Sequence, residues 1–574
     1  MDTLVHPGKG LSLSQLVFAL NEELKHAVHS PSYVARGCGL MGGWHTDFLY
    51  SFTFSEICQL DRDASTVLAT IREWRDSFVP INRIPLEVLS LVPTHIPAQK
   101  DRFRATFVCR RWRRTFLQHA ALWSQLYLRK GEVYVKRLLE RAQGTALDIF
   151  ASSVDDVSAM MLLPPHIKRI RFLDFADNQW VDIRMFSALY YGSLPLLRAL
   201  NINAVGIGRG DPGRPPLPLF SNAVNLQEFR LHSKMSPPLD HFAFPNLTFF
   251  ELSVAPVEEF RASQLLDFLE ASPMLQAVRV KIDGDILLDD VPQERIVVLP
   301  NLESLCLIFG DGGPGYGLAA HISCPSAKHT SLTHEGGAGL MTPQKIFPDS
   351  APWSAIVRQH TRSPIEEVTL EMRAPLNSVI ACSLTFRSPD ATVIRLHFEI
   401  VAIDEGEGAN WSEIYFEAIY HKVFYQASRT IQDLPLLDDV KRLCIRHSGP
   451  IPRFIEIVLI TDQVWRLFES VGPLEELIFY HCDMRPYLAP FLDYPEFRHV
   501  DKPAAFPQIK ELTILHPLCP PREDFEAAIV ELAESQHALG VPLERVTVRM
   551  DHLSAEMAGK LRLWVGIADC YDES

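Results

Sequence analysis

Apolar residues beyond residue 160 recur in a short frame, L-x-x-L-x-L, with apolar side chains at positions i, i+3 and i+5. Because side chains alternate across a strand, the last two apolar residues of each copy would face the same side of a short strand. Successive copies begin 30, 29, 21, 28 and 27 residues apart in a first group and 34, 35 and 34 residues apart in a last group. The eleven copies begin at Ile167, Leu197, Leu226, Leu247, Leu275, Leu302, Ile365, Val440, Leu474, Ile509 and Leu543.

Stretches with helical spacing separate some of these copies. Residues 263–272 and 522–539 have apolar residues on one side of a helix and therefore predict helices. Leucine-rich repeats contain one strand in about 20–29 residues, and a helix on the return leg lengthens that period. The frame resembles a leucine-rich-repeat solenoid, which would be degenerate because the asparagine ladder of regular repeats is missing.

Two long intervals, 308–364 and 371–439, lie on either side of the Ile365 copy and lack the frame. Within the second interval, residues 393–400 alternate between apolar and polar side chains, which predicts a strand. Residues 411–427 have the composition of a helix. We expect these intervals to be extended repeats whose strands join the same sheet.

A different, helical pattern occupies residues 84–126. Pro85 and Glu87 favour the start of a first helix, and two prolines then interrupt the chain. A second helix is expected from about Lys100 to Phe116. A bundle this short buries little apolar surface by itself, so a partner is expected to cover part of it. The apolar positions are Val88, Leu89 and Val92 in the first helix and Phe103, Phe107, Val108, Cys109, Trp112 and Phe116 in the second.

Charge is unevenly distributed along the chain. The formal net charge of −15 argues against nucleic-acid binding by the whole surface, because attraction to phosphates needs a positive face. Residues 81–126 carry eight Lys and Arg and two acids, a net +6, which leaves −21 for all other residues. The run 109–114, CRRWRR, is also typical of a nuclear-localisation or nucleic-acid patch. Its arginines alternate with core-type residues, which favours a protein partner.

The ten cysteines are scattered without a C-x-x-C pair, so we expect reduced thiols and not a disulfide framework. No run of eighteen apolar residues is present, and no membrane span or membrane partner is expected. The apolar segment 11–20 is followed at once by two acids, which favours an amphipathic helix over a signal peptide. A cytoplasmic or nuclear location is expected.

The order of residues from 84 to 123 resembles the F-box, the small helical module through which substrate receptors attach to SCF ubiquitin ligases. Ile84-Pro85 is similar to the Leu-Pro start of that family, and Val108-Cys109-x-x-Trp112 to its Val-Cys-x-x-Trp. The resemblance implies binding to the Skp adaptor and, through it, to a cullin. It implies the following residues as partner-binding: Ile84, Pro85, Leu89, Val92, Ile96, Val108, Cys109, Trp112, Leu122 and Trp123.

The predicted fold class is α/β, with an N-terminal helical F-box module followed by an irregular leucine-rich-repeat-like solenoid. The stretch 134–150 resembles the link between these two parts in many fungal F-box proteins. The predicted segments are an N-terminal extension of uncertain structure at 1–63, a helical lead-in at 64–80, an F-box-like domain at 81–127, a helical linker at 128–160 and the solenoid at 161–574.

We expect no catalytic site, no cofactor and no metal. The glycine-rich segment 310–317 lacks the Lys-Ser/Thr of a phosphate loop. The spacing of His321, Cys324, His329 and His334 matches no common zinc finger. An enzyme hidden in the long intervals is the remaining catalytic alternative, and no nucleophile, metal or phosphate motif supports it.

The expected function is that of a substrate-recognition adaptor of an SCF ubiquitin ligase, in the ubiquitin conjugation pathway. The F-box would hold the Skp adaptor, while the repeats capture an unknown protein target and raise its effective concentration near the ligase. Loops 205–217 and 309–316 are candidates for target binding because binding surfaces often lie on loops. The alternative is a leucine-rich-repeat interaction scaffold without a ubiquitin-ligase role.

Overall fold

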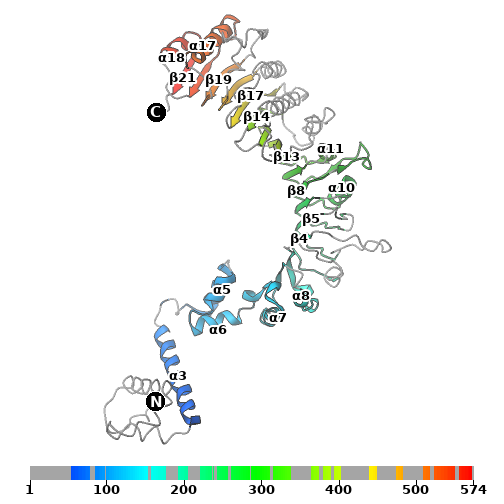
Figure 1. Cartoon of the computed structure of the whole chain (residues 1–574), viewed down its shortest axis with the longest axis vertical. Coiled ribbons are helices and arrows are strands. Elements are labelled where there is room, and N and C mark those ends of the chain that lie inside the picture. The colour runs from blue at the N-terminus through cyan, green and yellow to red at the C-terminus, as the bar shows by residue number, and fades with distance from the viewer. Residues whose placement is uncertain are drawn as a thin grey trace, which may run out of the picture. The chain divides into compact units, whose positions relative to one another are not determined.

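The computed structural model of the chain (Figure 1) places helices and strands between Phe54 and Tyr571. The chain divides into two compact units, residues 1–123 with 141–143 and residues 124–140 with 144–574. The loop 205–217 and the predicted helix 411–427 lie outside the described residues. The structure describes residues 54–77, 80, 84–96, 99–152, 157–175, 192–204, 220, 222–234, 237, 239, 242–255, 260–284, 286–310, 315–337, 364–373, 379–389, 393–401, 439–448, 474–482, 509–517, 522–549 and 555–571.

The described part of the first unit consists of one long helix and several short ones. The long helix α3 begins ten residues before the predicted lead-in at 64–80. Pro85 is the N-cap of α4, where its missing N–H costs no helical hydrogen bond. The helices are α3 (Phe54–Ser77), α4 (Leu86–Leu91), the 3-10 helix η2 (Val92–His95), α5 (Gln99–Ala105), α6 (Arg110–Gln118) and the 3-10 helix η3 (Ala120–Trp123).

The prediction of a single helix from Lys100 to Phe116 is wrong, because α5 and α6 are separated by four residues. The backbone N–H groups of Thr106, Phe107 and Val108 donate to carbonyl oxygens three residues earlier. Bonds of this type tighten and end a helix. Cys109 is extended, with φ −158° and ψ 172°, so the chain changes direction before α6 starts.

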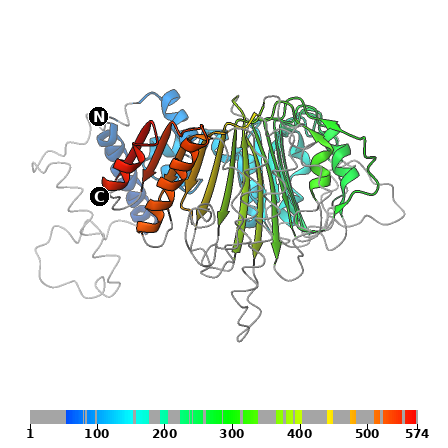
Figure 2. The same ribbon diagram turned by 90° about the horizontal axis from the view of Figure 1, so that it is seen from above.

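The second unit is built on a sheet of 17 strands. Neighbouring strands pair in the order β1-β2-β3-β4-β5-β6-β8-β11-β13-β16-β15-β14-β17-β18-β19-β20-β21. All pairs are parallel except β14 with β15 and β15 with β16, and the strands lie side by side in Figure 2. The fold is therefore mixed α/β with a large, mostly parallel sheet.

Every copy of the L-x-x-L-x-L frame coincides with a strand of this sheet. In ten of the eleven copies the last two apolar residues are buried, as the alternation predicts. The strands that carry the frame are β3 (Ile170–Phe175), β4 (Ala199–Ala204), β5 (Glu228–Ser233), β6 (Phe249–Val254), β8 (Ala277–Ile282), β11 (Ser304–Phe309), β14 (Glu367–Arg373), β17 (Arg442–Ser448), β18 (Leu474–Tyr480), β19 (Ile509–Leu515) and β20 (Arg545–Arg549).

The first copy is shifted by three residues from its predicted phase. The structure buries Ile170, Leu173 and Phe175, whereas Ile167 is only half-buried. Leu173 pairs with Leu200 of the next strand, so the frame starts at Ile170 and not at Ile167. Both phases satisfy the sequence pattern, and only the pairing with β4 decides between them.

The long intervals of the frame contribute strands to the same sheet, as predicted, but they interrupt its sequential order. The predicted strand at 393–400 is confirmed as β16 (Val393–Val401), which pairs in parallel with β13 (His329–Gly337). The next three strands are in reverse order: β16 lies beside β13, and β14 lies beside β17. Between them, β15 (Val379–Arg387) is antiparallel to both β16 and β14.

The sheet starts upstream of residue 161, at the end of the segment predicted as the F-box-like domain, and continues through the segment predicted as a helical linker. Helix α7 (Glu132–Arg141) occupies part of that segment, but β1 (Gln125–Tyr127) and β2 (Leu147–Ala151) pair in parallel and extend the sheet before β3. At the other end β21 (Ile567–Tyr571) follows β20. Shorter pairs join β7 (Phe260–Arg261) to β9 (Ile286–Leu287) and β10 (Val297–Val298) to β12 (Ile322–Ser323).

The two faces of the sheet differ in polarity. One face buries phenylalanine and aliphatic side chains, including the ring of Phe229. Phe268 of α10 reaches this face, since its ring lies 4.5 Å from that of Phe250. The other face carries polar and charged residues between the buried positions. The predicted helices are confirmed as α10 (Ala262–Glu270) and α17 (Arg522–Ala538); the others are α8 (Val157–Met160), η4 (Leu128–Lys130), η6 (Pro164–Arg169), α11 (Tyr316–Ala320) and α18 (Ala555–Leu561).

Candidate protein-binding surface

Five large apolar side chains are exposed on α4 and in the break between α5 and α6 of the first unit. Three belong to α4, namely Leu86, Val88 and Leu91, with exposed fractions of 53%, 49% and 55%. Phe107 and Val108, in the break between α5 and α6, are exposed by 74% and 59%. We call these five residues the apolar cluster. Because so much apolar surface in a small module is unfavourable in water, it is a candidate site for a protein partner.

The core beneath the cluster is aromatic. Leu89, on the opposite side of α4, and Phe116 of α6 are fully buried. The rings of Trp112 and Phe116 lie 5.1 Å apart, and those of Phe103 and Trp123 lie 5.4 Å apart. Aromatic pairs at these distances add stabilisation beyond the area that they bury. The module therefore has a core of its own that can hold the apolar cluster in place.

Hydrogen bonds from arginine side chains fix the segments around the cluster. The Arg111 guanidinium donates to the carbonyl oxygen of Ile84, which ties α6 to the start of α4. The Arg102 guanidinium donates to the carbonyl oxygen of Ile96 at 2.6 Å. Two arginines of the basic segment thus have a structural role. Others remain at the surface, including Arg110, Arg113 and Arg114.

One of these surface arginines lies beside the apolar cluster. The guanidinium of Arg113 lies 5.8 Å from the centre of the ring of Phe107, the most exposed member of the apolar cluster. Positive charge beside exposed apolar residues favours a partner with apolar residues near acids, because complementary charge assists docking. The local charge therefore supports a protein partner of acidic character.

The structure separates the ten residues predicted as partner-binding by their exposure. Pro85 and Val108 are exposed. Ile84, Val92, Ile96 and Cys109 are half-buried. Leu89, Trp112, Leu122 and Trp123 are buried, with exposed fractions between 0% and 8%, so they line the core of the module in the unbound chain.

Sequence reasoning did not single out Leu86, Leu91 and Phe107 as surface residues. In the six-residue helix α4, LEVLSL, apolar side chains occur all round, so helical periodicity cannot tell which side is buried. Phe107 was placed on the apolar face of a continuous helix. The break at 106–109 turns Phe107 outward. This break is seen in the backbone hydrogen bonds of the structure and not in the helical periodicity of the sequence.

The outer face of the sheet forms a second candidate surface, made of polar pairs. The Arg171 guanidinium donates to both carboxylate oxygens of Asp148, at 3.0 and 2.8 Å, and this bond raises the pKa of Arg171. Burial raises the pKa of Asp174, whose carboxylate accepts a hydrogen bond from Asn201 at 2.8 Å. This face can bind polar partners, and near β2 it also carries the half-buried rings of Tyr127, Phe150 and Phe172, which pack on one another.

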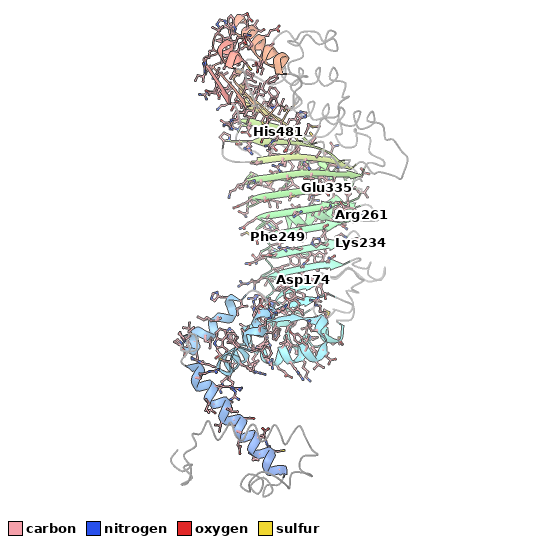
Figure 3. All side chains as sticks on the ribbon, turned by 60° about the vertical axis from the view of Figure 1, so that its left-hand side comes forward. Asp174, Lys234, Phe249, Arg261, Glu335 and His481 are labelled. Carbon is pink, nitrogen blue, oxygen red and sulfur yellow. The ribbon has the colours of Figure 1, made fainter. Side chains whose placement is uncertain are left out.

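Further along the face, the charged pairs form short ladders. Glu251 lies between two arginines, 3.7 Å from Arg230 and 3.9 Å from Arg279. The ammonium of Lys281 contacts Glu335, two strands away, at 2.6 Å; Figure 3 labels Asp174 and Glu335 on the sheet. Exposed pairs of this kind contribute only about 0–1 kcal/mol each to stability, so they remain available for exchange with a partner.

Groups that could bind a metal do not converge in the part of the chain that the structure describes. Among the described residues, no group of three or more His, Cys, Asp or Glu could hold a metal ion. Cys324 is buried, and its burial raises the pKa of the thiol to about 12. Also within the described ranges, no helix combines the length and the apolar composition needed to cross a membrane.

The comparisons with known proteins agree with the geometry of the helical module. The family model of the F-box-like domain matches residues 81–129, which include the whole apolar cluster. No match was found among curated proteins. The chain therefore contains an F-box-like domain at residues 81–129, most of which belongs to the first unit. F-box domains generally bind the Skp adaptor and serve as non-catalytic adaptors.

Proposed function

We propose that this chain is the substrate-recognition adaptor of an SCF ubiquitin ligase. The observation that carries the proposal is the apolar cluster within an F-box-like domain. The cluster binds the Skp adaptor, which links the chain to a cullin. The half-buried residues Ile84, Val92 and Ile96 contribute at the margin of the contact, and the buried Leu89, Trp112, Leu122 and Trp123 hold the module in shape.

The sheet acts as the receptor for a protein target. Its parallel strands, at intervals close to those of leucine-rich repeats, support the interpretation as a degenerate solenoid of such repeats. The outer face presents polar pairs to the target. The chain then contributes proximity, because a target held near the ligase reaches a high effective concentration at the ubiquitin-conjugating enzyme.

Co-expression with the Skp adaptor, followed by affinity purification, tests the proposal. The variant Leu91→Gln/Phe107→Gln removes two exposed apolar side chains without adding charge. Burying one such side chain stabilises a complex by about 1.5–3 kcal/mol, so recovery of the adaptor should fall at least about a hundredfold.

The matched control is Leu539→Gln/Leu563→Gln, since these two residues of the second unit are exposed by 58% and 72%. The control should recover the adaptor as the wild type does. Folded wild-type chain that recovers no adaptor would contradict the proposal. If the chain recovers the adaptor, but no target protein accumulates when the chain is deleted, a scaffold without a ligase role is favoured.

A further inference from the structure

Four cationic and aromatic side chains gather at the carboxyl ends of β17, β18 and β19. The guanidinium of Arg446 lies 4.3 Å from the centre of the Tyr480 ring, on the neighbouring strand. The rings of His481 and His516, which follow β18 and β19, lie 5.0 Å apart. Tyr480 contacts both histidines, with ring centres 4.6 and 5.7 Å away. We call Arg446, Tyr480, His481 and His516 the histidine cluster, and Figure 3 labels His481.

The backbone at both histidines is in the left-handed region. His481 has φ 53° and His516 has φ 49°; among the described non-glycine residues, only Phe220 shares a positive φ. This conformation costs a residue with a Cβ about 1–2 kcal/mol and is often found at functional sites. Two histidines in this costly conformation, at the ends of adjacent strands, indicate that the arrangement of their rings is functional.

Among the described residues, the charge around the cluster is positive. Besides the cluster itself, the described ionisable side chains in the same row of the face are His397 on β16, Glu371 on β14 and Arg549 on β20. Glu371 is opposite Arg446, and Arg549 is opposite Leu515, next to His516. One carboxylate is thus set against two arginines, with two histidines that add positive charge when they are protonated, in a chain whose net charge is −15.

The other carboxylates of these strands lie at the opposite end. Glu367, Glu476 and Glu511 are four residues nearer to the start of their strands, a separation of about 13 Å. Each has a partner there: Glu367 contacts Arg442 at 3.1 Å, Glu476 accepts from Thr513 at 3.2 Å and Glu511 contacts Arg545 at 3.8 Å. They do not neutralise the histidine cluster.

Guanidinium and imidazole N–H groups are donors that suit carboxylates and phosphates. The cluster extends from β17 to β19, two strand spacings or about 10 Å. That length matches anionic side chains two or three residues apart in an extended peptide. We propose that the histidine cluster binds an anionic segment of a protein target, whose charge comes from carboxylates or from phosphoserines.

This inference deepens the proposed function, because it names the chemistry of the target, and it rests on that function. It also implies a pH dependence. Burial, His516 and Arg446 lower the pKa of His481, so the unbound ring is neutral at pH 7. A bound anion offsets the repulsion and favours the protonated ring, so affinity rises as the pH falls below the ordinary value of about 6.5.

Fluorescence anisotropy with the full chain tests the inference. The probes are labelled hexaglutamate, a labelled peptide with three phosphoserines and, as the neutral control, labelled hexaglutamine. The variant Arg446→Gln/His481→Asn/His516→Asn removes the cations, and asparagine tolerates a positive φ. The matched control, Arg279→Gln/His232→Asn/His329→Asn, removes one arginine and two histidines from other strands of the same sheet.

Wild-type chain should bind at least one anionic probe at least about tenfold more tightly than the cluster variant does at pH 6, as expected for the loss of charged hydrogen bonds. The control variant should bind like wild type, and the wild-type affinity should fall several-fold between pH 6 and pH 7.5. The probe that binds shows whether carboxylates or phosphoserines are the source of the charge. Equal binding by the cluster variant, or equal binding of hexaglutamine, would overturn the inference.

Two readouts keep the outcome interpretable. If the cluster variant does not fold, the pKa of His481 can be measured in wild-type chain by histidine hydrogen exchange; saturating anionic probe should raise that pKa, and no change would overturn the inference. Recovery of the Skp adaptor is measured in parallel. If the cluster variant recovers the adaptor but binds the probe like wild type, this inference alone is refuted. If the wild-type chain recovers no adaptor, the proposed function is refuted.

Discussion

The F-box-like module and the sheet differ in whether their large apolar residues are exposed or buried. The module leaves Leu91 and Phe107 exposed by 55% and 74%, whereas strands such as β5 and β8 bury their large apolar side chains and expose charged ones. Both parts have an aromatic core. The difference therefore does not lie in how each part is stabilised, but in what each part leaves in contact with water.

The proposed function assigns a different kind of binding to each of these two parts. An exposed apolar cluster is unfavourable until a partner covers it, which suits a constitutive contact with one adaptor. A face of polar pairs is stable by itself and binds only a partner that replaces those pairs, which suits selective contact with a target. Apolar exposure therefore locates the first site but gives no help in finding the second.

The largest expected effect concerns thiols buried in the sheet. The thiol of Cys324 has a pKa of about 12, so its thiolate fraction at pH 8 is about a thousandfold below that of an ordinary thiol with a pKa of about 9. Alkylation of Cys324 by iodoacetamide, followed by mass spectrometry, should be slower by at least this factor in folded chain than in urea. Equal rates would show that the sheet does not protect its core.

Phe229 should be among the most sensitive positions of the sheet. It is fully buried, and the ring centres of Phe242 and Phe244 lie 5.1 and 5.2 Å away. Phe229→Ala should destabilise the sheet by about 3–5 kcal/mol, because it leaves a cavity. Phe249→Ala, on the outer face beneath Arg230, should cost less than about 1.5 kcal/mol. Urea denaturation followed by circular dichroism measures both, and similar losses would contradict the assignment of the two faces.

In the module, a buried and an exposed aromatic residue should behave differently. Trp112→Ala should destabilise the module by about 3 kcal/mol or more, because Trp112 packs on Phe116, while Phe107→Ala should cost less than about 1 kcal/mol. Limited proteolysis within residues 84–123 reports the stability of the module alone. Rapid cleavage of the Phe107 variant would show that this ring is part of the core.

A smaller effect is expected from Asp174. Burial raises the pKa of this carboxyl group in the folded chain, so the sheet loses stability as the pH rises from its ordinary value of 3.8 through the raised value. Asp174→Asn should remove this loss and stabilise the chain at pH 7 by less than about 1 kcal/mol, with no gain near pH 3.5. Thermal denaturation from pH 3.5 to pH 7 measures this difference in stability. A variant that is less stable than wild type at pH 7 would contradict the prediction.

Much of the sheet could be predicted from the sequence because strand alternation is a local property. The eleven frame copies and the strand predicted at 393–400 needed no knowledge of distant contacts. The phase of the first copy did, because Ile167 and Ile170 both satisfy the frame and only the pairing of Leu173 with Leu200 decides. The antiparallel strand β15 carries no frame, so its place between β16 and β14 was not predictable.

The candidate sites were only partly predictable for the same reason. The order of residues that resembles an F-box located the module, but short helices with apolar residues on every side do not specify which ones are buried. The histidine cluster brings together residues 70 positions apart, from Arg446 to His516, through the pairing of three strands. No motif in the sequence marks it.

The central claim is that the module alone contacts the Skp adaptor. Hydrogen–deuterium exchange of the full chain, with and without purified adaptor, tests it most directly. Peptides that cover residues 84–108 should exchange more slowly in the complex, while peptides from β4 to β8 and from β17 to β20 should be unchanged. Protection of the sheet strands, with unchanged exchange in residues 84–108, would contradict the division of binding between the module and the sheet.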